Sequence, residues 1–373
     1  MRAGDVLNGY TLLADFTVVG AGLSRWTFAR KGGREYFVKE FLSPTYPEAD
    51  APGSERIKAK KRARCAVFEE QHRSMQAALA PLSAYGGNLI VTLDFFRAGA
   101  KYYKTTERVD AVDLGVAGIA ALPFRQRLVL LKSVAHSLKI LHDLRIVHGD
   151  LKPDNVLVKR TELGYTSKLI DFDNSYVAGR PPAPTEIVGT INYYSPELLG
   201  YIQEDGVEAA ELGTAADVFA LGLIYSEYLT GRLPAYDPAY GEPSVAARSG
   251  VVLQVDRSGL DPALADLVDR MMLATPAARP TIGEVHAALM ALRGTGEAPA
   301  AAPAPARAPA AAPAPAPRTP PAPATSGLRG KLVGRAPAAP ASAPAPPAPA
   351  PSSGLRGKLL GRAPKDGGPD RGR

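Results

Sequence analysis

The chain has 373 residues, a formal net charge of +7, 22% charged residues and one cysteine. This length suits two average domains or one two-lobed domain with a tail. A single cysteine, Cys65, excludes an intramolecular disulfide, and no run of about 18 strongly apolar residues indicates a membrane span or a signal peptide. We therefore expect a cytoplasmic protein, with Cys65 as a small apolar helix residue.

The positive charge is concentrated near the C-terminal end. Residues 295–373 hold 19 of the 35 prolines and 11 Lys and Arg against 3 Asp and Glu, which leaves a net charge of about −1 for the rest. Because few large apolar residues occur there, burial cannot offset the entropy of ordering. The composition predicts a disordered Ala/Pro-rich tail over 294–373, so the basic pI does not indicate nucleic acid as a partner.

The first part of the chain reads as successive strands after a lead-in at residues 1–9. Alternating apolar residues indicate strands over 10–16, 18–22, 26–30 and 35–41, and Gly32-Gly33 between the last two is a hairpin signal. Gly20 and Gly22 would let backbone amides approach a phosphate, but an ordinary turn accounts for them as well.

Lys39 has an unusual place in the fourth of these strands. Strand alternation puts it on the face that carries Phe37 and Phe41. Such a lysine either extends along the strand end to water or is directed at an anionic ligand, and the strand pattern alone leaves both open.

A Pro- and Gly-rich loop over 43–54 precedes a long helix predicted over 55–82. Within this helix we expect Phe68 and Glu70, followed by Ala77 and Ala78, to form a small-residue inward face. Glu70 either pairs with a lysine across a cleft or stays on the surface.

The rest of the chain changes from strands to helices. Residues 89–96 and 101–107 read as strands and 110–122 as a loosely structured connector, and apolar spacings of three and four predict a buried helix over 123–142. Later helices begin near Ala215, after Asp261 and after Thr281. This order predicts an α+β fold of two lobes, joined near residues 107–110.

The densest polar stretch is His148-Gly-Asp-Leu-Lys-Pro-Asp-Asn155, followed at Asp171 by Asp-Phe-Asp. Short apolar strands at 156–158 and 169–170 flank it, so its carboxylates are expected on loops held by a hairpin. Burying so many polar groups costs free energy, so core packing alone does not account for this stretch. The polar segment over 174–190 is too long for a turn and suits a mobile functional segment.

Seven separated motifs resemble, in order and spacing, those of the eukaryotic-like (bacterial) serine/threonine protein kinases over about residues 10–293. The resemblance implies a two-lobed kinase fold with a small β-rich lobe at about 10–108 and a larger helical lobe at about 110–293. The motifs are Gly20-x-Gly22, Val38-Lys39, His148 to Asn155, Asp171-Phe172-Asp173, Gly189-Thr190 to Ser195-Pro196-Glu197, Asp217 to Gly222, and Ala278-Arg279-Pro280.

By this resemblance the cofactors are ATP and Mg²⁺. Lys39 would hold the α and β phosphates under Gly20 and Gly22 and would be fixed by Glu70. The resemblance also makes Thr106 the gatekeeper residue and 107–109 a hinge, so that Glu107 and Val109 would present backbone groups to adenine.

The resemblance likewise assigns the transfer step. Asp150 would orient the acceptor hydroxyl and take its proton, and Lys152 would neutralise the γ-phosphate. Asn155 and Asp171 would ligate magnesium through oxygen atoms, which this hard cation prefers. Lysine at position 152 favours protein substrates with Ser or Thr acceptors.

Three further residues are expected to support the fold. The resemblance implies an ion pair between Glu197 and Arg279 in the large lobe, and it makes Asp217 a brace for the catalytic loop.

Three positions depart from the family pattern. Arg25 lies near the usual third loop glycine, Gly149 replaces the arginine before Asp150, and Asp173 replaces a glycine. Without that arginine a phosphorylated activation segment lacks its main partner, so we expect activity that needs no phosphorylation of residues such as Ser175 or Thr185. Asp173 should restrict the backbone after Phe172.

Two other functions fit parts of the pattern. His-Gly-Asp and Ile-Asp-Phe-Asp are similar to small-molecule phosphotransferases of the aminoglycoside and choline kinase type, but those enzymes lack the Gly-Thr to Ser-Pro-Glu segment. A nucleotide-binding pseudokinase scaffold would explain the altered glycine loop and Asp173. Against it, the chain retains Lys39, Asp150 and Asp171.

The tail contains a repeat, Ser-Gly-Leu-Arg-Gly-Lys-Leu-x-Gly-Arg-Ala-Pro, at 326–337 and again at 353–364. The two copies are either a duplicated solubilising linker or a pair of docking peptides whose combined binding raises avidity for a partner.

Overall fold

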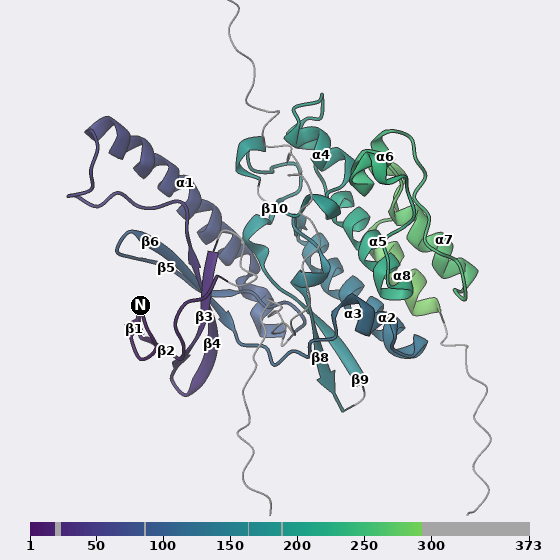
Figure 1. The fold of residues 1–373 in the computed structure, drawn as a ribbon, viewed down its shortest axis with the longest axis horizontal. Helices are drawn as coiled ribbons and strands as arrows, with labels where there is room; N and C mark the ends of the chain where they lie inside the picture. The colour runs from purple at the N-terminus through teal and green to yellow at the C-terminus, as the bar shows by residue number, and fades with distance from the viewer. Residues whose placement is uncertain (19–23, 86, 163, 188, 293–373) are drawn as a thin grey trace, which may run out of the picture. The chain divides into compact units, whose positions relative to one another are not determined.

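The computed structural model describes residues 1–292 except 19–23, 86, 163 and 188. Gly20, Gly22 and both tail repeats therefore lie outside the described residues. The described part has a β-rich N-terminal lobe and a helical C-terminal lobe, as expected (Figure 1).

The N-terminal lobe is built on a six-stranded antiparallel sheet with the strand order β1-β2-β3-β4-β6-β5. Gly32 and Gly33 form the predicted two-residue turn between β3 and β4, both with positive φ (56° and 77°), where a side chain would be strained. The strands are β1 (Val6–Leu7), β2 (Tyr10–Leu12), β3 (Ser24–Lys31), β4 (Arg34–Phe41), β5 (Thr92–Ala98) and β6 (Lys101–Glu107).

The register of this sheet sets one face of the site. Lys39 on β4 is paired with Trp26 on β3 and with Lys104 on β6, and Phe37 is paired with Thr106. Because directly paired residues point to the same side of a sheet, all five face the same side.

Helix α1 (Glu55–Leu79) begins after Ser54, whose hydroxyl accepts a hydrogen bond from the amide of Ile57. Its inward side chains are Cys65, Phe68, His72 and Leu79. The expected inward face of small residues is wrong, because Ala77 and Ala78 are exposed. Phe68 and His72 are four residues apart and share one helix face, which leaves residues 77 and 78 on another.

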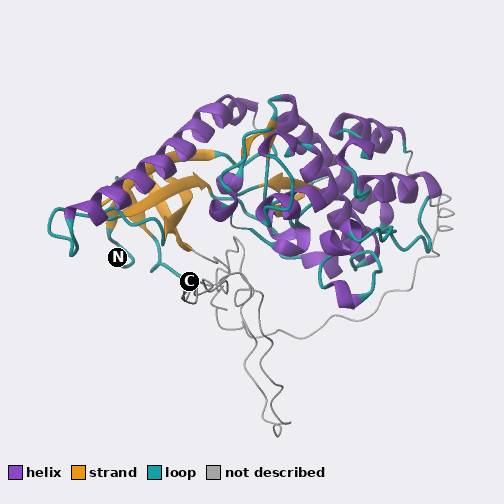
Figure 2. Cartoon of the chain, turned by 90° about the horizontal axis from the view of Figure 1, so that it is seen from above, coloured by secondary structure: helices purple, strands orange, loops and turns teal. Residues whose placement is uncertain are grey.

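The C-terminal lobe packs around helix α5, whose residues 216–226 are all buried. Asp261 and the Thr281–Glu284 capping box begin α7 and α8 as predicted. Helix α2 was not predicted, since its residues were assigned to a loosely structured connector. The helices, seen from above in Figure 2, are α2 (Gly115–Ala120), α3 (Phe124–Asp143), α4 (Pro196–Ile202), α5 (Ala215–Thr230), α6 (Pro243–Arg248), α7 (Pro262–Met271) and α8 (Ile282–Ala291).

Two small sheets hold the polar loops. The predicted hairpin is β8 (Val156–Thr161) with β9 (Gly164–Leu169), and it separates Asn155 from Asp171. The second sheet pairs β7 (Ile146–Val147) with β10 (Tyr176–Val177), which places the chain after Asp171 beside the chain before His148. None of the described helices combines the length and apolar character that a membrane crossing requires.

Candidate active site

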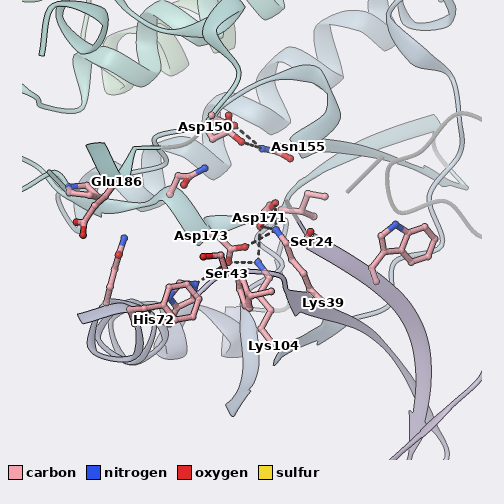
Figure 3. Close-up of a pocket in the computed structure, with 18 of the residues that line it drawn as sticks. Ser24, Lys39, Ser43, His72, Lys104, Asp150, Asn155, Asp171, Asp173 and Glu186 are labelled. Atoms are coloured by element: carbon pink, nitrogen blue, oxygen red, sulfur yellow. Dashed lines mark hydrogen bonds and ion pairs between the residues drawn. The ribbon is translucent and has the colours of Figure 1, made fainter. Parts of the chain in front are cut away.

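A cavity of about 510 Å³ lies against the sheet face that carries Lys39 (Figure 3). Its size is within the range of ligand pockets. Trp26, Phe37 and Ile170 line its apolar part. Predicted site residues also line it, namely Lys39, Thr106, Asp150, Lys152, Asn155 and Asp171.

The two other expected hinge residues, Glu107 and Val109, are not among the residues that line this cavity. Glu107 is the exposed last residue of β6. Val109 is buried and packs in an apolar cluster with Ile90 and Ile170, which are both cavity residues. The roles of Thr106, Glu107 and Val109 in holding adenine remain predictions.

Asp150 is held by three neighbours around its carboxylate. Lys152 Nζ lies 2.7 Å from Asp150 Oδ2, and the amide of Thr190 donates to Oδ1 at 3.2 Å. The side-chain amide of Asn155 donates to Asp150 Oδ2 at 3.3 Å and to the Asp150 backbone carbonyl at 2.7 Å. Lys152 also donates to the Thr190 hydroxyl at 2.8 Å, so the loop that carries Asp150 is joined to the segment around Thr190.

Asp217, at the start of α5, braces this loop as expected. Its carboxylate accepts hydrogen bonds from the amides of His148 (2.7 Å) and Gly149 (3.1 Å), and it lies 2.9 Å from His142 Nε2. Burial alone would raise the pKa of Asp217, but the interactions with His142 and His148 outweigh it and the pKa is lowered. Asp217 is therefore an ionised, fully hydrogen-bonded anchor.

Four charged side chains form an ion cluster at the back of the cavity: Lys39, Lys104, Asp171 and Asp173 (Figure 3). Lys39 Nζ donates to Asp171 Oδ2 at 2.9 Å and to Asp173 Oδ2 at 2.7 Å. Lys104 Nζ donates to Asp171 Oδ1 at 2.7 Å and to Asp173 Oδ1 at 2.5 Å. Each lysine therefore bridges both carboxylates.

The charges in the ion cluster support one another. Burial lowers the pKa of Lys39, but the attraction of Asp171 and Asp173 is larger and the net pKa is raised. For Asp171, burial raises the pKa, but Lys104 and Lys39 together bring it well below its usual value. Asp171 also has a left-handed backbone (φ 64°), a conformation that is uncommon outside glycine and often found at functional sites.

The expected pair between Glu70 and Lys39 is absent from the ion cluster, and this prediction is wrong for the structure. Glu70 is exposed and accepts a hydrogen bond from Ser74 at 3.0 Å. Residues 68 and 70 are about 200° apart around a helix, so Phe68 and Glu70 cannot both face inward. From α1, His72 lies beside the cluster, with its Nε2 3.8 Å from Asp173 Oδ1.

Glu70→Gln is therefore expected to leave nucleotide affinity within about twofold of wild type, because an exposed carboxylate contributes little. Trp26 is the only tryptophan and lines the cavity, so its fluorescence can follow an ADP titration. Lys39→Met provides the positive control with weakened binding. A tenfold loss for Glu70→Gln would instead place this glutamate at the lysine.

Sequence reasoning missed Lys104 and the role of Asp173. Strand alternation places Lys39 on the cavity face of β4, and it likewise places Lys104 on the same face of β6 as Thr106. The sequence of β6 therefore already indicated a second lysine on the cavity face. Arg25, which also departs from the family pattern, lies in β3, and its Nε donates to Glu40 at 3.0 Å.

The expected ion pair of the large lobe is present. Arg279 binds Glu197 through two parallel hydrogen bonds of 2.7 and 2.8 Å, and both side chains are buried. Arg279 also donates to the carbonyls of Leu273 and Ala215, which joins the α4 start to α5 and the chain before α8.

Two lobes around a cavity, with a braced Asp150 loop and the Glu197–Arg279 pair, define a protein kinase fold. The sequence matches the protein kinase domain family over residues 55–289, more than half of the chain. The chain belongs to this family. The matched segment starts at α1, so β1 to β4 with Lys39 lie ahead of it.

Relatives place the chain with the eukaryotic-like serine/threonine kinases, including a bacterial one. Serine/threonine-protein kinase pkn2 of Myxococcus xanthus is 28% identical over 178 residues, which are 46% of this chain and 20% of that protein. Ovarian-specific serine/threonine-protein kinase Lok of Drosophila melanogaster is 29% identical over 212 residues, 53% of this chain and 39% of that protein. Probable serine/threonine-protein kinase gdt8 of Dictyostelium discoideum is 27% identical over 165 residues, 44% of this chain and 12% of that protein. The chain spans less than half of each of these relatives.

Proposed function

We propose that this protein transfers the γ-phosphate of ATP to serine or threonine hydroxyls of proteins, with Mg²⁺. The observation that carries the proposal is that one cavity is lined by all five of the expected residues, Lys39, Asp150, Lys152, Asn155 and Asp171. Transfer of a highly charged phosphoryl group needs cations and positioning more than covalent chemistry. This cavity supplies both.

The donor set fits magnesium bound together with phosphates. Asp171 contributes a carboxylate and Asn155 an amide oxygen, since the amide nitrogen of Asn155 is directed at Asp150. Among the described residues no group of three or more His, Cys, Asp and Glu side chains could hold a metal alone. Magnesium commonly uses one or two protein ligands plus substrate phosphates, where it neutralises charge on the phosphoryl oxygens.

In the proposed step Asp150 accepts the proton of the acceptor hydroxyl while that oxygen bonds to the γ-phosphorus. The bond from the γ-phosphorus to the β–γ bridging oxygen breaks, and ADP leaves with the electron pair. Lys152, 2.7 Å from Asp150, offers positive charge where the phosphoryl group passes. Lys39 and Lys104 bring two ammonium groups to the phosphate side of the cavity.

The region after Thr190 favours a protein acceptor over a small alcohol. Thr190 contacts Asp150 and Lys152, and Ser195 caps α4 by accepting from the amide of Leu198. The buried Glu197–Arg279 pair then fixes this segment to the large lobe. Such a rigid platform beside Asp150 suits an extended peptide.

A transfer assay separates the two kinds of acceptor. The full-length protein is incubated with γ-labelled ATP and Mg²⁺, and label is measured in casein, in histone, in choline and in an aminoglycoside. We expect label in protein Ser or Thr residues. Label in choline or the aminoglycoside alone would establish the small-molecule reaction instead.

We further propose that activity needs no phosphorylation of the activation segment. The chain after Asp171 is already held by backbone contacts: Tyr176 pairs with Val147, and the Ala178 amide donates to the Arg145 carbonyl at 2.8 Å. The Ser175 hydroxyl donates to the His148 carbonyl at 3.0 Å. These bonds supply the order that a phosphate would otherwise have to induce.

Thr185→Ala is therefore expected to retain phosphotransfer within about twofold of wild type, because the exposed Thr185 makes no contribution to these backbone contacts. Initial rates of freshly dephosphorylated wild type and Thr185→Ala provide the comparison. Ser175 is only 1% exposed and is unsuitable as a second test position, since its removal breaks a buried hydrogen bond. An initial rate tenfold below that of untreated wild type, either for dephosphorylated wild type or for Thr185→Ala, would contradict the proposal.

A further inference from the structure

We propose that Asp173 positions Lys39 for the nucleotide phosphates, with Lys104 as its second cation, so that this task does not fall to a carboxylate on α1. The inference rests on the proposed function of the same cavity. It gives a role to Asp173, which replaces the family's glycine, and to the buried Lys104, which belongs to none of the family motifs.

The contacts of Asp173 are those of an anchor. Its two oxygens bind different lysines, with Oδ2 at 2.7 Å from Lys39 Nζ and Oδ1 at 2.5 Å from Lys104 Nζ. The side chains of Asp173, Lys39 and Lys104 are 16%, 15% and 3% exposed, so their charges are mostly shielded from water. A charge in such a place is stable only when it is paired.

Charge balance explains why Lys104 and Asp173 occur together. The ion cluster contains two ammonium groups and two carboxylates. With glycine at position 173, Asp171 alone would face both lysines, although Asp171 is also the proposed magnesium ligand. When Asp171 takes part in metal binding, the carboxylate of Asp173 remains fully available to Lys39 and Lys104.

The position of Asp173 in the chain has a mechanical consequence. Asp173 lies two residues after Asp171, in the short 3-10 turn Phe172–Asn174. The carboxylate that holds Lys39 therefore comes from the loop that follows β9, and α1 contributes Phe68 and His72 to an aromatic cluster with Phe41 instead. Correct placement of Lys39 does not require a particular rotation or approach of α1.

The test measures ADP binding with Mg²⁺ through Trp26 fluorescence and, separately, kcat and KM for ATP, using the full-length protein. Asp173→Asn is expected to weaken ADP binding and to lower kcat/KM by roughly 10- to 100-fold, the size of one hydrogen bond between charged groups. Asp143→Asn is the matched control. Asp143 is an exposed aspartate 2.7 Å from Lys139 on α3, and its replacement should change neither value by more than about twofold.

A relocation experiment distinguishes positioning from general support of the fold. His72 Nε2 is 3.8 Å from Asp173 Oδ1, so a glutamate at position 72 can bring a carboxylate to the same lysines. Asp173→Gly combined with His72→Glu is expected to recover most of the affinity and kcat/KM lost by Asp173→Gly. If Asp173→Asn or Asp173→Gly unfolds, Asp173→Asn with Lys104→Met removes one charge of each sign and should fold while still binding ADP weakly.

The ADP affinity and the kcat/KM of these variants decide whether Asp173 positions Lys39. ADP affinity and kcat/KM within about twofold of wild type for folded Asp173→Asn would overturn the inference, as would a folded relocation variant no better than Asp173→Gly. If wild type shows Asp173-dependent ADP binding but transfers no phosphate, the positioning inference stands and the proposed function fails.

Discussion

Replacing Asp150 by Asn is expected to lower kcat for phosphotransfer by about 10²- to 10⁴-fold, the usual contribution of a positioned general base. The amide keeps the shape of the carboxylate but cannot take the proton of the acceptor hydroxyl. It also loses the charge that holds Lys152 at 2.7 Å. The loss should appear in kcat with every protein substrate, since it concerns the transfer step.

ADP affinity separates this effect from collapse of the site. Asp150 and Trp26 both line the cavity, but Asp150 belongs to the wall with Lys152 and Thr190, away from the sheet that carries Lys39. Asp150→Asn should therefore bind ADP within about threefold of wild type and melt cooperatively. Full activity of the variant would refute the role of Asp150, and Asp143→Asn again provides the control for preparation and assay.

Much of the fold follows from local sequence signals. The Gly32-Gly33 turn and the alternation on each side of it predict the β3–β4 hairpin, and the apolar spacing from Phe124 onward predicts α3 nearly to its ends. The capping pattern at Thr281 locates the start of α8. Helix α2 escaped prediction because six residues rich in Gly and Ala show little periodicity.

The parts of the site that lie close together in sequence were also predictable. Asp150, Lys152 and Asn155 are neighbours along one loop, so their spacing in the motif largely determines how their side chains lie relative to one another. The ion cluster is different, because Lys39 and Asp171 are 132 residues apart and Lys104 and Asp173 are 69 apart. Their meeting depends on strand register and lobe packing, which no single stretch of sequence specifies.

Glu70 shows how small an error in helix phase moves a residue out of a site. Each residue advances by about 100° around a helix, so the choice among neighbouring positions decides which side chain faces Lys39. The rings of Phe68 and His72 pack against each other and against Phe95, with ring centroids 4.1 to 5.9 Å apart, and this packing fixes the rotation of α1. The carboxylate of Asp173, the additional acid in Asp-Phe-Asp, pairs with Lys39 where the carboxylate of Glu70 was expected.

Gly149→Ala is expected to lower the free energy of unfolding by about 2 to 4 kcal/mol, from a left-handed backbone and from overpacking together. Gly149 has φ 79°, and a Cβ there would overlap the carbonyl oxygen of Asn174 and lie 3.3 Å from the Tyr176 ring. The effect is measured as the shift in urea midpoint at constant m-value. Gly250→Ala is the matched control, because Gly250 has φ 86° but nothing within 4 Å of its Cβ position.

The difference between these two variants isolates the packing of Asn174 against the catalytic loop. If Gly149→Ala lowers the free energy of unfolding no more than Gly250→Ala does, the close contact between Gly149 and Asn174 does not contribute to stability. Gly149 would then be required only for its backbone conformation in the turn. Gly149→Arg, which restores the family's usual residue, should be at least as destabilising as Gly149→Ala and should not make activity respond to phosphorylation. The space that the arginine would need is occupied by the Asn174 backbone, and that contact sets the chain after Asp171 directly on the loop that carries Asp150.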